Sequence, residues 1–509
     1  MAPAGAGSHE HIRSHQIDDG GNRMEFESEL AVHRTDIPGL VVLDLPVHGD
    51  NRGWFKENWQ RAKMVALGLP DIRPVQNNIS YNTSRGVTRG IHAEPWDKYI
   101  SIAIGEIFGA WVDLRPGATF GRVFTCTLDP SKAIFVPRGV GNAFQTLADG
   151  TTYTYLVDAH WSLAQKRTYT FVNLADPDLA IDWPIPLTAA ELSDADRAHP
   201  PLREVVPMAP KRTLVTGCNG QLGRAVRTYA QEHDLQGFDY CDIDTFDFAD
   251  PDAYSAYDWS LYGTVINCGA YTAVDRAETR EGRAVAWRAN AAGPALLART
   301  CVEHSITLVH VSSDYVFDGV LDSHTELEPF APLGVYGQTK AAGDIAVATC
   351  PAHYIVRSSW VIGEGRNFVK TMMALSRRVA DNDDALTQVS VVDDQLGRLT
   401  FTRDMARGIF HLLDSGSDFG TYNLTGEGEV RSWADIAQAV FDRTCGNGEA
   451  VVPVSTARYY GASEVPVSPR PIHSALDLTK IEATGFMPAD WERDLTAYVD
   501  AVASAEDGS

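Results

Sequence analysis

The chain is poor in cysteine and has no long apolar run. Its 509 residues include seven cysteines, and no two of them form a CxxC pair. This fits a reducing compartment better than a disulfide framework, so we expect a cytoplasmic protein. No stretch approaches the roughly 20 apolar residues of a membrane span. Residues 1–25 are rich in Gly, His and Asp and lack an apolar core, which predicts a disordered tail and no signal peptide.

Positive charge is also scarce. The chain has 43 Lys and Arg against 67 Asp and Glu, a net charge of -24. We therefore expect no nucleic-acid partner, although local arginines and helix N-termini can still hold a phosphorylated ligand. Hydrophobic residues make up 44% and charged residues 22%, which indicates a globular protein long enough for two or three domains.

Residues 26–200 read as an all-β domain. Short apolar runs, among them VVLDLPV, YISIAI, IFGAWVDL and TYTYLV, alternate with turns rich in Gly, Pro, Asp and Asn. Many strands at this spacing predict a sandwich or barrel, with one short helix near residues 60–66. The titratable candidates in it are Arg89, His92, Lys98, Tyr153, Tyr155 and Asp196.

We expect no metal in this domain. A barrel-type site needs two or three histidines and a carboxylate closely spaced, and His92 has no histidine two residues on. A lone histidine in a strand is more often a hydrogen-bonded core or rim residue than a base, so both readings of His92 stay open on the residues alone.

The pattern changes after a Pro-rich linker at residues 201–211. From 212 to 509, strands alternate with helices, which predicts a doubly wound parallel sheet. From Thr421 onward we expect a smaller mixed lobe, with a helix that begins near Ser432 and carries Trp433 and Phe441 as core residues.

The segment TLVTGCNGQLGRAV places a glycine-rich turn between a strand and a helix. Gly217, Gly220 and Gly223 allow a tight turn and let backbone N–H groups approach a pyrophosphate, although an ordinary strand–helix turn has the same pattern. The next strand is rich in acids that favour NADH if one of them reaches a ribose hydroxyl. These acids are Asp239, Asp242 and Asp244, and Asp247 with Phe248 could reach the adenine edge.

A second constellation is the set Ser313, Tyr336 and Lys340. Ser313 ends the buried run TLVHVSS, and Tyr336 and Lys340 are four apart, on one face of a helix. We expect the ammonium to lower the phenol pKa, so that the phenol can protonate a carbonyl oxygen while a hydride reaches its carbon. Tyr-x-x-x-Lys alone is a common helix pattern.

Residues 35–200 resemble dTDP-4-dehydrorhamnose 3,5-epimerase. The motifs are NRGWFKENW, PVQNNISYNTSRGVTRGIH, GEIFGAWVDLRPGATFG, FVPRGVGNAFQTL, IDWP and LSDAD. The resemblance implies a jelly-roll (cupin-like) fold with His92 as base, Asp196 as its partner, Tyr155 as acid and Lys98 as active-site lysine. It also implies that the substrate is bound by Arg52, Glu57, Gln76, Asn78, Arg89, Asn142 and Trp161.

Two positions depart from that family. Asn142 stands where the family usually has histidine, and Gly109 where it commonly has aspartate. Two alternatives therefore remain for this half: epimerisation at a single carbon, or a β domain that only binds a nucleotide sugar.

The second half resembles dTDP-4-dehydrorhamnose reductase, an extended short-chain dehydrogenase with a Rossmann-type fold. The motifs are INCGAYTAVDRAE, SSDYVFDG, VYGQTKAAGD, VRSSWVIGEGRNFVKTM, DDQLGRLT and SPRPIHSALD. The resemblance implies NADPH or NADH as cofactor, Tyr336 as acid, Lys340 as cofactor anchor and Ser313 as hydroxyl partner.

The same resemblance places further residues. The cofactor would contact Gly217, Asn219, Gly220, Gln221, Leu222, Gly223, Asp247, Phe248, Ala270, Tyr271 and Lys340, and the substrate would contact Trp360, Asn367, Gln395 and Arg470. Leu399, where the family usually has proline, implies a modest loop change. A relative of this family is a regulatory subunit of methionine adenosyltransferase, but the complete Ser313, Tyr336 and Lys340 set favours an enzyme.

Together, the two resemblances imply a fused epimerase–reductase. It would convert dTDP-4-dehydro-6-deoxy-D-glucose, a dTDP-4-keto-6-deoxy sugar, to dTDP-L-rhamnose. Because the epimerase family often dimerises by exchanging strands, we also expect a homodimer through the β domain.

Overall fold

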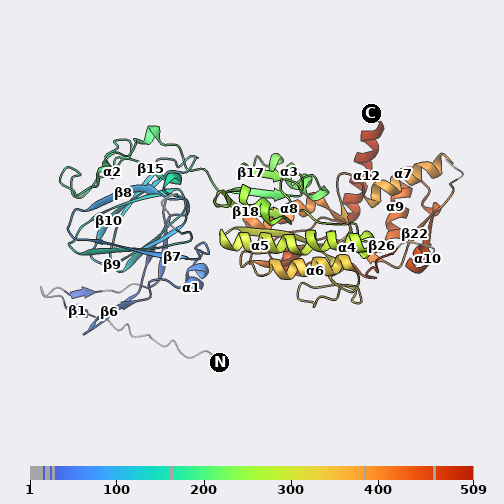
Figure 1. Ribbon diagram of the computed structural model, residues 1–509, viewed down its shortest axis with the longest axis horizontal. Helices are drawn as coiled ribbons and strands as arrows, with labels where there is room; N and C mark the ends of the chain where they lie inside the picture. The colour runs from blue at the N-terminus through green and yellow to red at the C-terminus, as the bar shows by residue number, and fades with distance from the viewer. Residues whose placement is uncertain are drawn as a thin grey trace, which may run out of the picture. The chain divides into compact units, whose positions relative to one another are not determined.

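The computed structural model describes residues 29–160, 165–382, 386–461 and 466–507, and the strands β1 (His15–Ile17) and β2 (Arg23–Glu25). The rest of the tail predicted at residues 1–25 lies outside this description, as does Trp161. The chain forms two compact units, Met1–Pro210 and Lys211–Ser509 (Figure 1).

The first unit consists of two antiparallel sheets, so the predicted all-β fold is confirmed. One sheet has the order β11 (Val123–Leu128), β10 (Ile107–Asp113), β13 (Val140–Thr146), β8 (Thr88–Ala93), β15 (Thr170–Phe171). The other has the order β3 (Ala31–Arg34), β4 (Val41–Asp44), β12 (Lys132–Val136), β9 (Lys98–Ile104), β14 (Thr151–Val157), β7 (Gln76–Asn82). A hairpin of β5 (Val47–Asp50) and β6 (Gly53–Lys56) lies outside them.

Apolar side chains from both sheets meet between them. Trp111 and Phe144 of the first sheet pack with Ile100 and Ile134 of the second, and all four are at most 4% exposed. Since alternate residues of a strand point to opposite faces, this places the other faces outside the sandwich. The predicted short helix is α1 (Arg61–Ala66), and its Met64 packs on the outer face of the second sheet.

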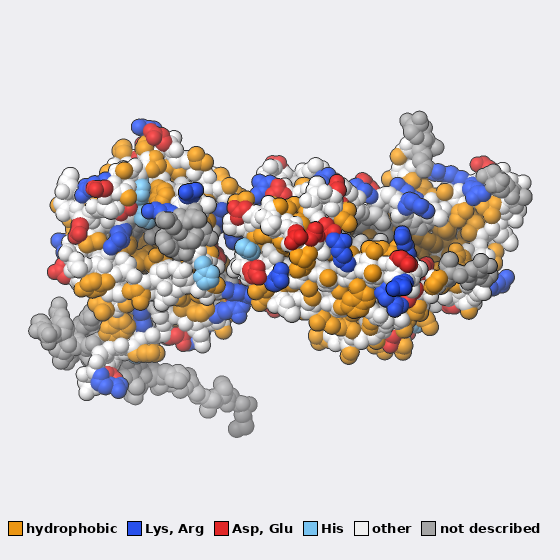
Figure 2. Space-filling model, viewed as in Figure 1, with side chains coloured by type: hydrophobic (Ala, Val, Ile, Leu, Met, Phe, Trp, Pro, Cys, Tyr) orange, Lys and Arg blue, Asp and Glu red, His pale blue; other side chains and the backbone are white. Residues whose placement is uncertain are grey.

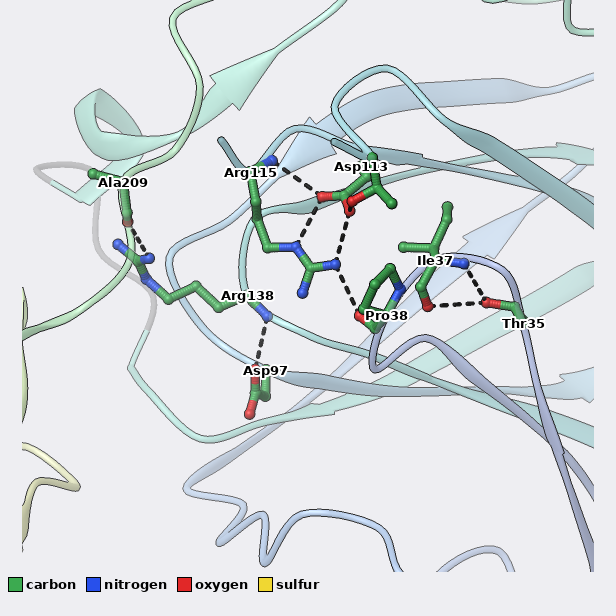
Figure 3. A network of polar contacts seen from close by, with 9 residues as sticks. Thr35, Ile37, Pro38, Asp97, Asp113, Arg115, Arg138 and Ala209 are labelled. Atoms are coloured by element: carbon green, nitrogen blue, oxygen red, sulfur yellow. Dashed lines mark hydrogen bonds and ion pairs between the residues drawn. The ribbon is translucent and has the colours of Figure 1, made fainter. Parts of the chain in front are cut away.

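The Pro-rich stretch after α2 (Asp194–Arg197) packs along the first unit. Leu202 and Met208 join an apolar cluster that includes Leu114, whose carbonyl accepts a hydrogen bond from Met208 N at 2.8 Å. The Arg138 guanidinium donates to Ala209 O, and its backbone N–H donates to Asp97 at 2.7 Å (Figure 3). Contacts to the first unit therefore continue up to residue 209.

The second unit is built on a parallel sheet with the order β17 (Phe238–Cys241), β16 (Arg212–Thr216), β18 (Tyr262–Asn267), β19 (Thr307–Ser313), β20 (His353–Ser358), β25 (Gly420–Asn423). Adjacent residues of each strand pack on opposite helix layers. Val215 and Ile266 contact the layer of α3 (Gln221–Glu232) and α8 (Thr402–Asp414). Leu214 and Val265 contact the layer of α5 (Gly293–Glu303) and α6 (Val335–Val347). The predicted doubly wound sheet is confirmed.

This strand order places the topological switch point between β16 and β18. In open parallel sheets the ligand crevice lies at the carboxyl ends of the strands on either side of such a point. The glycine-rich turn follows β16, and the segment of Ala270 and Tyr271 follows β18. α4 (Arg280–Trp287) runs into a π-helical turn, Arg288–Ala292, which precedes α5.

A smaller lobe gathers around α7 (Phe368–Ala380), α9 (Trp433–Cys445) and α12 (Trp491–Asp507). As predicted, α9 begins after Ser432, whose side chain caps it together with Asp435. Phe441 and Leu399 are fully buried in the lobe core. The remaining elements are β21 (Val361–Ile362), β22 (Val389–Val392), β23 (Leu396–Gly397), β24 (Thr400–Phe401), β26 (Arg431–Ser432), β27 (Val451–Val454), α10 (Thr456–Tyr460) and α11 (Thr479–Glu482).

Among the described helices, none combines the length and apolarity that crossing a bilayer requires. Figure 2 shows acidic and basic side chains interspersed with apolar ones over the visible face of each unit.

Asp113 and Arg115 form a buried ion pair in the first unit. Asp113 is fully buried and accepts hydrogen bonds from Arg115 Nε and Nη2, each at 2.8 Å (Figure 3). Burial alone would raise its pKa, but the hydrogen bonds from Arg115 and Thr119 hold the pKa below its ordinary value. Asp50 and Arg52 repeat the same two-residue spacing on an exposed turn.

We expect Asp113→Asn to lower the free energy of unfolding of the first unit by about 1–3 kcal/mol, because a partly buried guanidinium loses its buried, charged acceptor. Thermal and urea unfolding of the full chain, followed by circular dichroism, measures the change. Asp50→Asn is the matched control and should leave the transition in place, because exposed pairs contribute little. Equal shifts in both variants would contradict this account.

Candidate active sites

The first site is organised by His92 and Asp196. Asp196 is 7% exposed and lies in α2, where its backbone N–H donates to the capping Ser193 hydroxyl. His92, on β8, lies with Nε2 2.9 Å from Asp196 Oδ1. An ionised carboxylate can only accept, so Nε2 carries the hydrogen and Nδ1 keeps a lone pair. Burial would raise the Asp196 pKa, but the bond from His92 holds it lowered, and the carboxylate stays ionised at neutral pH.

His199 is a neighbour that sequence reasoning missed. Its ring centroid lies 5.3 Å from that of His92, and its Nε2 lies 3.9 Å from Asp196 Oδ1. Its other face stacks on Phe171 at 4.8 Å. Burial, followed by the nearby His92, lowers the pKa of His199. The available signal was its position three residues after Asp196, one helical turn away.

Lys98 and Asn142 join the two sheets. Lys98 is 3% exposed on β9, and its Nζ donates to Asn142 Oδ1 of β13 at 2.5 Å and pairs with the Glu94 carboxylate. Burial lowers the Lys98 pKa well below its ordinary value. Asn142 is the register partner of His92, and its amide donates to Tyr153 Oη at 3.4 Å. The amide therefore lies between the histidine and the buried ammonium.

Tyr155, on β14, lies on the Lys98 side of this group. The Lys98 Nζ is 5.8 Å from its ring centroid, and Tyr153 is 5.7 Å away, centroid to centroid. Burial raises the Tyr155 pKa, and the positive charge of Arg89 partly opposes the rise. The phenol is therefore protonated at neutral pH, which is the form that can act as an acid.

The other residues predicted to bind substrate in this unit have fewer contacts with the His92 site. Gln76 donates to Asn78 at 2.7 Å on β7, where Asn78 is the register partner of Tyr155. Arg52 is held by Asp50, and Glu57 accepts from Lys63 at 2.8 Å; both predicted residues are solvent-exposed or half-exposed.

Gly109 has a packing explanation. A Cβ at this position would lie 2.1 Å from the Trp111 ring. The indole fills the space where the resembled family commonly has an aspartate, so this departure belongs to the core of the sandwich.

In the second unit, the three motif glycines have different requirements. Gly217 has φ +64°, and a Cβ there would lie 2.6 Å from Gly269 backbone atoms. A Cβ on Gly223 would lie 2.3 Å from Gly217 O. A Cβ on Gly220, the N-cap of α3, would meet only Gly217 O, at 3.2 Å. Gly217 and Gly223 serve the turn itself, whereas Gly220 leaves open space at the helix N-terminus.

The acidic candidates differ in their position relative to β17. Asp239 lies within the strand and binds Arg212 and Tyr262, away from the carboxyl edge. Asp242 follows the strand directly and accepts from Asn219 N at 2.8 Å, so it is the acid that reaches the glycine turn. Asp247 pairs with Arg288 at 2.5 Å.

Two further predicted segments line the switch point. Phe248 packs against Gly269 and Gly293, at each of which a Cβ would clash with its ring. Tyr271 is clamped by Asn290 of the π-helical turn: the Asn290 side chain accepts from Tyr271 N at 2.8 Å and donates to Tyr271 O at 3.0 Å. Asn290 was not predicted.

Ser313, Tyr336 and Lys340 meet in one cleft of about 660 Å³, which Gly220, Gln221 and Ala270 also line. Lys340 is 2% exposed, and its Nζ donates to Val311 O at 2.6 Å. Burial lowers the Lys340 pKa to about 8, against the opposing charge of Asp344.

The expectation that Lys340 lowers the phenol pKa is wrong for this structure. Burial, with the charge of Asp314 added to it, raises the pKa of Tyr336 to about 12. The Lys340 ammonium donates to the Val311 carbonyl, and Lys340 is not among the groups that shift the Tyr336 pKa. Helical spacing shows that two residues share a face, but it does not show how deeply they are buried.

The substrate-side residues divide into two groups. Trp360 lines the cleft with φ +47° and stacks on Trp433, with ring centroids 3.7 Å apart. Trp433, expected as core, therefore both packs on the lobe core and faces the cleft. The other three predicted residues do not line it. Asn367 caps α7, and Gln395 donates to Thr456. Arg470 forms a bidentate ion pair with Asp275.

Two family models match the chain. Residues 34–204 match dTDP-4-dehydrorhamnose 3,5-epimerase, and residues 211–504 match the RmlD substrate binding domain. The Protein RmlC homolog of Streptococcus pyogenes is 52% identical over 192 residues, 36% of this chain and 96% of that protein. The dTDP-4-dehydrorhamnose reductase of Aggregatibacter actinomycetemcomitans is 36% identical over 301 residues, 56% of this chain and 97% of that protein.

A solved structure agrees with the second match. The dTDP-4-dehydrorhamnose reductase of Bacillus anthracis, in complex with NADP, is 29% identical with a TM-score of 0.50, and the match covers 56% of this chain and 97% of that one. Both resemblances are thereby confirmed. The chain belongs to the dTDP-4-dehydrorhamnose 3,5-epimerase family through its first unit and to the RmlD family, with its dTDP-4-dehydrorhamnose reductases, through its second.

Proposed function

We propose that this chain converts dTDP-4-dehydro-6-deoxy-D-glucose to dTDP-L-rhamnose in two steps. The first unit epimerises C3 and C5, and the second reduces the C4 ketone with NADPH or NADH. The observation that supports this most directly is that each unit brings a complete acid–base set together: His92, Asp196 and Tyr155 in one, Ser313, Tyr336 and Lys340 in the other.

In the first unit, His92 Nδ1 removes the proton next to the C4 ketone, because its Nε2 is occupied by Asp196. The ionised Asp196 stabilises the imidazolium that forms. The enolate is stabilised by the buried Lys98 ammonium. Tyr155 returns a proton from the opposite side, which inverts the carbon. A neutral amide at Asn142 accepts from Lys98, whereas an imidazolium there would repel it, so the substitution is compatible with this chemistry.

In the second unit, the glycine turn fits a dinucleotide. Gly220 leaves open space where α3 begins, and backbone N–H groups at a helix N-terminus favour a pyrophosphate. The Bacillus anthracis relative contains NADP, which supports the same class of cofactor here. Asp242 is already bonded to the turn and, as an acid, favours a ribose hydroxyl over a 2′-phosphate. When bound, the nicotinamide supplies the hydride.

The protein supplies the proton. Tyr336 stays protonated at neutral pH and donates to the C4 oxygen, while the Ser313 hydroxyl orients that oxygen. Lys340, whose ammonium donates to Val311 O at the cleft, would hold the ribose of a bound cofactor. Trp360, stacked on Trp433, forms the apolar wall on the substrate side. The side chains of Asn367 and Gln395 are hydrogen-bonded within the lobe, and neither lines the cleft.

We further propose a cytoplasmic homodimer through the first unit, with no nucleic-acid partner. β7 pairs only with β14 among the described strands, which makes it an edge strand of its sheet. Its outward Ile79 and Tyr81 are 69% and 63% exposed. An edge strand that exposes two large apolar side chains favours pairing with a second chain.

The two activities should separate by single substitutions. We expect His92→Ala to lower the rate of cofactor-free deuterium uptake from D₂O at C3 and C5 by about a hundredfold or more. Reduction of separately prepared dTDP-4-dehydro-L-rhamnose should persist. Tyr336→Phe should do the reverse. NMR of the sugar and NADPH absorbance report the two steps. Deuterium at one carbon only in the unmodified protein would contradict epimerisation at both centres.

The glycines give a matched pair. Gly220→Ala should raise KM for NADPH by about tenfold with little change in melting temperature, because its Cβ intrudes where the pyrophosphate binds. Gly223→Ala should destabilise the second unit, because its Cβ meets backbone atoms. Cofactor kinetics and thermal unfolding measure the two effects. The assignment fails if Gly220→Ala leaves cofactor binding unchanged.

The dimer is tested by charge on the edge strand. A double variant, Ile79→Lys with Tyr81→Lys, should sediment as a monomer, whereas the unmodified chain should sediment at twice its 55.6 kDa mass. Leu327→Lys, at a site 93% exposed in the second unit, is the control and should remain dimeric. A monomeric unmodified chain would refute the proposal.

A further inference from the structure

Two imidazoles and one carboxylate converge in the first unit. His92, Asp196 and His199 each offer one ligand atom, and the three atoms lie within 4.8 Å of one another. His92 Nε2 and Asp196 Oδ1 are 2.9 Å apart, and His199 Nε2 is 3.9 Å from the same oxygen. The three residues come from β8, α2 and the turn after α2. Local spacing in the sequence therefore predicts no metal here, since the second histidine is distant from the first.

A ring nitrogen of His199 faces Asp196 without bonding to it. The His199 side chain is 11% exposed, and its buried Nδ1 makes no hydrogen bond of good geometry within the described residues, although the Gly90 backbone is near enough to oppose the lowering of its pKa. Its Nε2 faces Asp196 at 3.9 Å, which is beyond hydrogen-bond length. Phe171 holds the ring in place by stacking. His199 Nε2 and Asp196 Oδ1 are therefore close but not bonded directly, and an ion between them would bond to both.

We propose that this cluster binds a divalent ion of the zinc class through His92 Nε2, an Asp196 oxygen and a ring nitrogen of His199. Two imidazoles and a carboxylate are ligands that Zn²⁺ and its neighbours prefer. With ligand bonds of about 2.0–2.2 Å, tetrahedral geometry places ligand atoms about 3.4 Å apart. The observed spacings of 2.9, 3.9 and at most 4.8 Å bracket that value, so changes of about 0.5–1.4 Å in these spacings complete the set.

Metal binding and base catalysis exclude one another at His92. In the free site Nε2 donates its hydrogen to Asp196, and Nδ1 holds the lone pair that accepts the substrate proton. When Nε2 coordinates a metal, the ring adopts its other neutral tautomer: Nε2 gives up its hydrogen to solvent and Nδ1 takes one up from solvent. A neutral ring with Nδ1–H can no longer accept a proton. The ion therefore inhibits epimerisation and leaves reduction, which uses Tyr336, unaffected. This consequence rests on the proposed function, whereas the binding itself does not.

Binding is measured directly and without substrate. Co²⁺ serves as a spectroscopic probe through the visible absorption of a low-coordinate site, and Zn²⁺ is titrated against a chromogenic chelator. The variants are His199→Asn and, as a matched control, His33→Asn. His33 bonds to Asp44 at 2.6 Å in an exposed histidine–carboxylate pair of the same unit. We expect His199→Asn to weaken Zn²⁺ binding at least about tenfold and to remove the Co²⁺ band, while His33→Asn changes neither.

Activity provides the second readout. Zn²⁺ should suppress deuterium uptake from D₂O in the unmodified chain, reversibly on adding a chelator, without slowing reduction of dTDP-4-dehydro-L-rhamnose. The His199→Asn variant should need about ten times more Zn²⁺ for the same loss, and its metal-free deuterium uptake shows that it is folded. Equal Zn²⁺ affinity in His199→Asn and the unmodified chain would overturn the site. Zn²⁺ binding without suppressed uptake would leave the site standing but overturn its action on His92.

Discussion

Each active site depends on an ammonium group that the fold takes out of water. Lys98 is 3% exposed and Lys340 2% exposed, and burial lowers both pKa values. A buried cation is costly unless fixed oxygen atoms receive it. For Lys98 these are the Asn142 amide and the Glu94 carboxylate, and for Lys340 the Val311 carbonyl. These bonds link one sheet of the sandwich to the other, and α6 to β19, so catalytic geometry and packing are the same constraint.

Much of this architecture could be predicted, because it follows from the local pattern of apolar runs, turns and helices. Short apolar runs separated by turns predicted the sandwich, and the alternation of strands and helices after residue 212 predicted the parallel sheet. His92 and Asp196 were paired through a family motif, and they lie in contact. Contacts between distant segments had no such signal. His199 lies beside His92 only because the turn after α2 folds onto β8. Asn290 binds the Tyr271 backbone from a π-helical turn, which the sequence pattern does not predict.

The spacing of residues along the chain also failed to predict properties that depend on burial and on hydrogen-bond partners. Tyr336 and Lys340 share a helix face as predicted, yet the phenol pKa is raised, because burial and the charge of Asp314 disfavour the ionised phenol. Asn367 resembles a ligand contact by motif, but its amide oxygen caps α7 and its NH₂ group donates to Gly363 O. A polar side chain in a family motif can thus serve the backbone beside a site, and only the hydrogen-bond partners distinguish the two uses.

The packing of the Pro-rich stretch has a consequence for the ratio of the two enzymes. Met208 and Ala209 are anchored on the first unit, and β16 of the second begins at Arg212. Little free chain joins two cores that are each complete, so neither can be lost or supplied separately without cutting the backbone. Every ribosome that completes this chain delivers one epimerase-family unit and one reductase-family unit, and their stoichiometry stays at unity whatever the level of expression.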